Sequence, residues 1–177
     1  MHTLKSISPA AVPAALEKAL RYRLLNEPLE AESVCLDILR VDPANQEAHV
    51  TLLLARTDLF QDEYMAAFER AKAALASLTD KYDRAYYEGV VHERWAKAQT
   101  LRRVPGHMVR GWYLHAMQCY ERAQALAALD NPDAILRWNT CARVLERTAR
   151  AAESEQSVSR DIVTEYDDET PSALFHK

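Results

Sequence analysis

Apolar residues recur every three or four positions along most of the chain, which is the spacing of one face of an α-helix. Turn signals that contain proline, asparagine or aspartate interrupt this pattern. Between the interruptions we expect seven helices, over residues 13–26, 29–41, 46–59, 63–78, 79–103, 107–129 and 134–155. Asp62 is the expected N-cap of the fourth helix. No segment alternates with the period of a strand, so the predicted fold class is all-α.

The two ends of the chain differ from this helical part. We expect residues 1–11 to form a flexible N-terminus, residues 12–155 to form the helical domain, and residues 156–177 to form an acidic tail. Residues 151–177 hold seven acidic side chains against two basic ones, and they offer few apolar anchors. Such a composition buries too little apolar surface to offset the entropy of ordering, so we expect the tail to be disordered.

Composition and charge narrow the function classes. Only three residues are glycine, too few for the clustered turns that cradle phosphates or dinucleotides. The formal net charge is −4, so no overall basic field favours a nucleic acid as partner. No window of about 18 apolar residues occurs, and we expect no membrane insertion. The cysteines lie singly within the helical pattern, which predicts buried free thiols and a cytoplasmic location. They are Cys35, Cys119 and Cys141.

Motifs for catalysis or metal binding are scarce. His92-Glu93 is not followed by a second histidine at the spacing of a zinc-protease helix. His115 and Cys119 share one helix face and could form half of a metal site, but we favour a packed pair. The tryptophans Trp95, Trp112 and Trp138 are interpreted as packing residues rather than a stacking surface. We therefore expect no enzyme, no catalytic residue, no metal and no cofactor.

One triplet of residues recurs along the chain, in each case on a single helix face. It reads Ala31-x3-Cys35-x2-Ile38, then Ala67-x3-Ala71-x2-Ala74, then Ala116-x3-Tyr120-x2-Ala123. A small or aliphatic residue and a larger one precede each triplet: Ala19-x2-Tyr22, Leu53-x2-Arg56 and Gly89-x2-His92. Small side chains let two antiparallel helices approach closely, and a larger side chain fills the gap one turn later.

These residues resemble the tetratricopeptide repeat (TPR), a helix–turn–helix of 34 residues. Ala19, Tyr22, Ala31 and Pro43 match its pattern in the first unit, and Asp42-Pro43-Ala44-Asn45 resembles a junction between units. The resemblance implies a right-handed array of about three antiparallel hairpins plus a capping helix, over residues 12–155. A generic helical bundle with chance spacing is the alternative.

The resemblance also implies a binding groove lined by the first helix of each unit. The stripes that would face it are Leu16, Leu20 and Arg23, then Val50, Leu54 and Thr57, then Tyr86, Val90 and Glu93. Most of these positions are apolar, which predicts an apolar or amphipathic segment of another protein as the partner. The alternative is that the seventh helix or the ends of the chain fill the groove.

The third unit is longer than the others, since Ala67 and Ala116 are 49 residues apart instead of 34. We expect its hairpin to overhang its neighbours by roughly 10 Å, at 1.5 Å per residue. The overhang is basic and would dock an acidic surface, although helix capping explains part of the pattern. One candidate surface is the acidic run Glu165-Tyr166-Asp167-Asp168-Glu169 of this chain or of a second copy. Its residues are Arg94, Lys97, Arg102, Arg103 and Arg110.

The function that the sequence favours is a non-catalytic scaffold or adaptor for protein–protein interaction and assembly. Two alternatives stay open. One is a TPR-type chaperone that holds an aggregation-prone client in the groove, and the other is a nucleic-acid-associated module that uses the basic tip.

Overall fold

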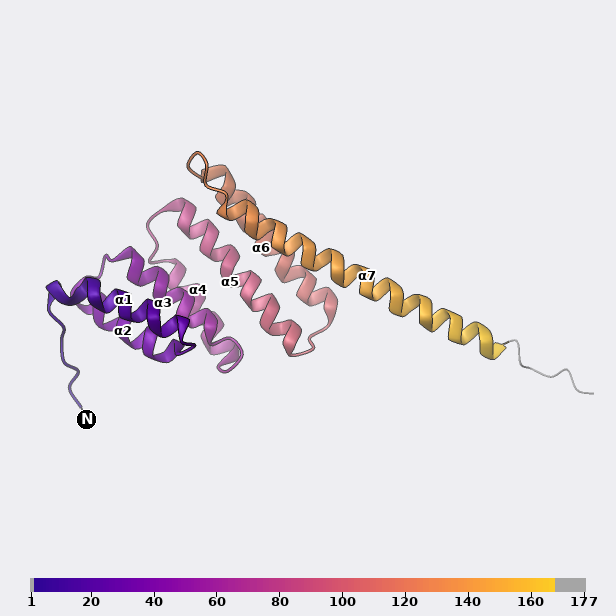
Figure 1. Cartoon of the computed structure of the whole chain (residues 1–177), viewed down its shortest axis with the longest axis horizontal. Coiled ribbons are helices and arrows are strands. Elements are labelled where there is room, and N and C mark those ends of the chain that lie inside the picture. The colour runs from indigo at the N-terminus through magenta and orange to yellow at the C-terminus, as the bar shows by residue number, and fades with distance from the viewer. Residues whose placement is uncertain (1, 168–177) are drawn as a thin grey trace, which may run out of the picture. The chain divides into compact units, whose positions relative to one another are not determined.

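The computed structural model describes residues 2–167 and shows an all-α protein with no strand in that range. Seven α-helices follow a short 3-10 turn at Pro9–Ala11 (Figure 1). Their bounds are α1 Val12–Leu24, α2 Pro28–Val41, α3 Gln46–Asp58, α4 Tyr64–Leu75, α5 Lys81–Leu101, α6 Gly106–Leu126 and α7 Asp133–Asp167. The chain divides into two compact units, residues 1–141 and 142–177, and α7 belongs to the first unit only as far as Cys141.

The starts of two helices follow from side-chain caps. Asn45 Oδ1 accepts a hydrogen bond from the Ala48 amide at 2.9 Å at the start of α3. Asp80 Oδ1 does the same for the Asp83 amide, also at 2.9 Å, at the start of α5. Each bond satisfies one of the amides that the first turn of a helix leaves unpaired. The expected cap at Asp62 was wrong, because α4 begins one residue later and has no side-chain cap bond.

The end of α7 is a second correction, because the helix runs to Asp167 instead of ending near Glu155. No glycine or proline occurs between Asp133 and Asp167, so the change to an acidic composition does not break the helix. Residues 156–167 of the expected tail are therefore helical. The rest of that tail, residues 168–177, lies outside the described residues.

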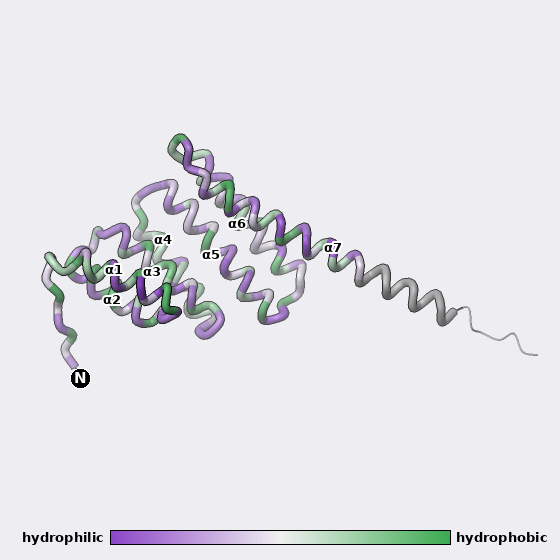
Figure 2. The backbone as a smooth tube through the Cα atoms, in the orientation of Figure 1, coloured by the Kyte–Doolittle hydropathy of each residue, from purple (hydrophilic) through white to green (hydrophobic). Residues whose placement is uncertain are grey.

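Consecutive helices pack against each other from α1 to α6, and alternate helices also touch. The contacts join α1 to α2, α2 to α3 and so on, and in addition α1 to α3 and α3 to α5. The recurring triplets explain these close contacts, since all nine of their residues are buried. Hydrophobic and hydrophilic residues are interspersed along each helix, as Figure 2 shows. No helix in the described part of the chain has the length and apolarity that a membrane crossing needs.

Aromatic side chains dominate the centre of the compact unit formed by residues 1–141. The Phe68 ring stacks on the Trp95 ring at a centroid distance of 4.3 Å, and the Phe60 ring meets Trp95 edge-on at 5.5 Å. This cluster joins α4 and the turn before it to α5. Burying three large aromatic residues together contributes several kcal/mol to folding, at about 25 cal/mol per Å² of apolar surface. The interpretation of Trp95 as a packing residue is confirmed.

The α5–α6 hairpin is longer than the hairpins before it, as the sequence predicts. α5 and α6 have 21 residues each, whereas α1 to α4 have between 12 and 14. Arg94 of α5 pairs with Asp58, the last residue of α3. The final two turns of α5 therefore extend past the end of α3, and the turn at residues 102–105 follows them.

Candidate functional site

Side chains of α1, α3 and α5 together line a shallow depression of about 310 Å³. Its apolar part consists of Leu16, Leu20, Val50 and Tyr87. Polar side chains complete it: Gln46, Glu47, Thr51 and Asp83. Because the three helices are far apart in the sequence, only their packing in the fold creates this surface.

The structure brings together three of the nine groove residues predicted from the sequence, namely Leu16, Leu20 and Val50. Thr57, Val90 and Glu93 are buried and do not line the depression. On α5 the lining residues are Asp83 and Tyr87, while Tyr86 turns toward α6 and its ring lies 5.8 Å from that of Tyr120. The predicted stripe on α5 (Tyr86, Val90 and Glu93) therefore does not line this depression. Leu54 is half-buried and packs against the central cluster.

An arginine–aspartate row crosses the same three helices nearer to the C-terminal end of α3. Arg23 of α1 donates to Asp58 of α3 at 2.9 Å, and Arg94 of α5 pairs with the other oxygen of the same carboxylate. Arg94 also donates to Thr57 Oγ1 at 2.8 Å. Two guanidinium groups thus share one carboxylate, which leaves an excess positive charge at this end of the face.

The basic tip predicted from the sequence is only partly present. Arg94 and Lys97 lie before the tip and pair with Asp58 and Glu93, respectively. Arg102 donates to the backbone carbonyl of Gln61 at 2.5 Å. Arg103 and Arg110 are exposed, and no ion pair involves either one among the described residues. The tip therefore offers fewer free charges than the sequence predicts.

Glu93 is a fully buried carboxylate, with 0% of its surface exposed. The Tyr120 hydroxyl donates to Glu93 Oε2 at 2.7 Å, Lys97 Nζ donates to Oε1 at 2.5 Å, and Arg137 Nη1 lies 3.3 Å from Oε1. Burial and the negative charge of Glu93 raise the pKa of Tyr120 far above its usual value. For Arg137, burial lowers the pKa and the negative charge of Glu93 raises it. The net effect is a raised pKa. This cluster connects α5, α6 and the first turns of α7, and buried charges need such partners.

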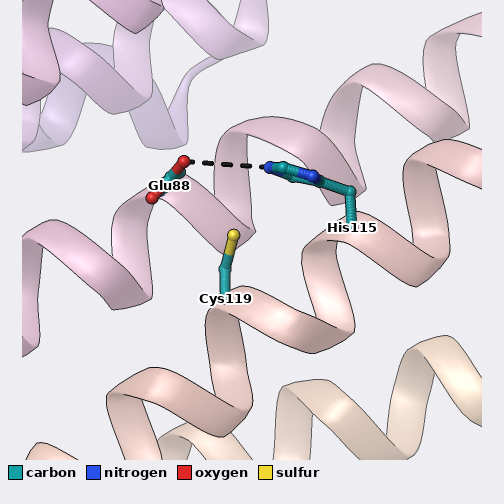
Figure 3. A group of neighbouring side chains, drawn as sticks. All are labelled: Glu88, His115 and Cys119. Atoms are coloured by element: carbon teal, nitrogen blue, oxygen red, sulfur yellow. Dashed lines mark ion pairs between the residues drawn. The ribbon is translucent and has the colours of Figure 1, made fainter.

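A second polar cluster lies on the α5–α6 hairpin, and the sequence indicated only half of it. His115 and Cys119 of α6 are joined by Glu88 of α5, so that one ligand atom from each residue lies within 4.8 Å of the others (Figure 3). The neighbouring His92 is buried, and its ring centroid lies 4.1 Å from that of His115. Burial and the charge of His115 lower the pKa of His92 to about 4, so its ring is neutral near pH 7. The missed signal is that Glu88 and His92 have the same i, i+4 spacing as His115 and Cys119.

Comparisons of the chain with protein-family models, with curated proteins and with solved structures give no match. The function is therefore inferred from the geometry of the fold and its surfaces.

Proposed function

We propose that the chain is a TPR-like, non-catalytic protein-interaction module, and that it binds an apolar or amphipathic segment of another protein on the face of α1, α3 and α5. The observation that carries this proposal is the depression to which all three helices contribute side chains. A surface built from alternate helices of a hairpin series is typical of repeat proteins that bind peptides.

The packing of the helices supports the repeat part of the proposal. Contacts between consecutive helices, together with contacts from α1 to α3 and from α3 to α5, are those expected when hairpins stack side by side. The small residues of the first predicted repeat, Ala19 and Ala31, have no exposed surface. Arg56, at a position where the family has tyrosine, donates to Glu32 of α2 at 2.9 Å, so a polar contact there replaces an aromatic one.

The chemistry of the face indicates the kind of segment that fits it. Leu20 and Val50 provide apolar contact in the depression, and each large apolar side chain that a partner buries there contributes about 1.5–3 kcal/mol. The arginine–aspartate row at the other end carries more positive than negative charge. An amphipathic helix with an acidic side chain near one end of its apolar stripe would match both features.

A selection of displayed peptides on the purified full-length protein tests the proposal. Leu20 lines the depression and Leu36 of α2 does not, yet each has 44% of its surface exposed. We expect the enriched peptides to be amphipathic and to bind at least tenfold more weakly to Leu20→Glu, whereas Leu36→Glu binds them like the wild type. Equal binding to the two variants would contradict the groove assignment.

The same experiment separates the two alternatives. A chaperone for unfolded clients would bind many unrelated extended segments with similar affinity, without the helical spacing of apolar residues. A nucleic-acid module that uses Arg103 and Arg110 would bind single or double strands with an affinity that falls steeply as salt rises. We expect neither behaviour, because much of the predicted basic tip is already paired within the chain.

A further inference from the structure

Four residues with metal-binding side chains form a two-by-two arrangement on the α5–α6 hairpin. Glu88 and His92 lie one turn apart on α5, and His115 and Cys119 lie one turn apart on α6. Figure 3 shows the carboxylate, the imidazole and the thiol pointing into the space between the two helices. His115 Nε2 lies 3.8 Å from Glu88 Oε1, and the Cys119 sulfur completes a triangle whose sides are all within 4.8 Å.

These distances are close to those of a metal site. Zinc holds nitrogen, oxygen and sulfur ligands at about 2.0–2.3 Å, so the ligand atoms of a tetrahedral site lie about 3–4 Å apart. The triangle needs to contract by roughly 1 Å at most. Glu88 and His115 can make this adjustment, because their side chains are 30% and 45% exposed and can change rotamer. Cys119 is buried and fixes the inner corner of the site.

A cationic group already bridges two of the three ligands. Arg122 Nη2 donates to Glu88 Oε2 at 2.8 Å and to the Cys119 sulfur at 3.1 Å. The Arg122 side chain is 58% exposed and can move out into solvent. The arrangement therefore accepts positive charge at the position between the carboxylate and the sulfur, where a metal ion would lie.

Two further features favour a cation with one open coordination position. A wide depression of about 660 Å³ lies directly outside the cluster, and Glu88, His115 and Arg122 line it. Behind His115, the buried His92 ring has a nitrogen, Nδ1, without a hydrogen-bond partner among the described residues. Unpaired buried nitrogens are uncommon, and a support for His115 would explain this one.

We propose that Glu88, His115 and Cys119 bind a borderline-soft divalent cation of the zinc type, and that the ion displaces the Arg122 guanidinium. The ion cross-links α5 to α6 and leaves a position open toward the outer depression. Mixed imidazole, thiolate and carboxylate ligands select zinc over calcium or magnesium, which prefer oxygen ligands alone. The site lies on the hairpin itself and does not depend on the groove of α1, α3 and α5.

Cobalt(II) is the probe that tests the proposal, because a thiolate bound to cobalt gives a charge-transfer band in the near ultraviolet. We expect the metal-free, full-length protein to bind one equivalent of cobalt(II) with this band, and zinc to displace it. Cys119→Ser should abolish the band, whereas Cys141→Ser, which changes another fully buried thiol, should leave it unchanged. No band at one equivalent, or a band that persists in Cys119→Ser, would overturn the proposal.

Variants at three exposed positions keep the test valid if Cys119→Ser does not fold. His115→Gln should weaken cobalt binding at least tenfold, and His107→Gln, an exposed histidine near the start of the same helix, should not change it. Arg122→Ala removes the competing cation and should tighten binding several-fold. If His115→Gln and His107→Gln bind cobalt equally, or if Arg122→Ala weakens binding, the proposed ligand set is wrong.

Discussion

Replacing Gly89 by alanine tests the close contact between α5 and Tyr120 of α6. A Cβ atom at this position would lie 2.5 Å from Tyr120 Cε1 and 2.8 Å from Tyr120 Cδ1. Carbon atoms prefer a separation of about 3.5–4.0 Å, so the ring or the helix must move by about 1 Å. The Tyr120 ring is not free to move, because it is fully buried and its hydroxyl donates to Glu93.

The expected cost follows from three contributions. Overpacking a buried site costs about 1–3 kcal/mol. Strain on a hydrogen bond to a charged group costs up to about 1.5 kcal/mol more. Alanine returns about 1 kcal/mol because it favours helix more than glycine does. Gly89→Ala should therefore lower the free energy of unfolding by about 2 kcal/mol, which corresponds to a decrease in Tm of roughly 6 °C.

Gly111→Ala is the matched control, since this glycine also lies inside a long helix but a Cβ there meets nothing within 4 Å. We expect it to raise stability by about 0.5–1 kcal/mol. Urea unfolding followed by circular dichroism measures both variants. The double variant Gly89→Ala/Tyr120→Leu should be less unstable than the sum of its single changes, because the smaller side chain makes room. The reasoning is refuted if Gly89→Ala is as stable as the wild type.

Two further predictions concern polar contacts within residues 1–141. Tyr120→Phe removes the hydroxyl that donates to the buried carboxylate and should lower the free energy of unfolding by about 1.5–3 kcal/mol; an unchanged urea midpoint would contradict this. Asp58→Ala leaves Arg23 and Arg94 facing each other and should cost about 1 kcal/mol at low salt and less at high salt. Asp37→Ala, which breaks an exposed pair one turn apart, is its control and should change stability by less than about 0.5 kcal/mol; equal effects of the two changes would contradict the role of the row.

Much of the fold could be predicted from the sequence because its signals are local. Proline, asparagine and aspartate mark the turns, and the capping bonds of Asn45 and Asp80 show how they act. The recurring small residues correctly mark buried positions. Ala31, for example, has no exposed surface. The all-α class and the order of the helices follow from these signals.

The rotation of α5 could not be predicted, and this is why the predicted stripe on α5 differs from the residues that line the depression. α5 contacts α3, α4 and α6, so buried residues occur around most of its circumference between Ala85 and Gln99. A helix that is buried on several sides has no single apolar stripe, and no periodic signal distinguishes Tyr86 from Tyr87. Contacts in three dimensions decide which of them lines the depression, since both are half-buried.

The burial of Glu93 and the joining of Glu88 to His115 and Cys119 could not be predicted for a related reason. Glu93 is charged, and a charged residue in a helical pattern is ordinarily exposed. Its partners Tyr120 and Arg137 come from later helices, so hydropathy along the chain does not show that it is buried. Glu88 completes the cluster of His115 and Cys119 only because α5 and α6 lie side by side.

Photo-crosslinking in the native cell tests the central claim, which is that the face of α1, α3 and α5 binds another protein. A photoreactive amino acid replaces Leu20 in the full-length chain in one experiment and Leu36 in the other, since these positions are equally exposed. Mass spectrometry then identifies the crosslinked peptides. We predict that position 20 crosslinks to an amphipathic segment of a different protein and that position 36 does not. Crosslinks from position 20 only to this chain's own termini or α7, or equal crosslinking at the two positions, would contradict the claim.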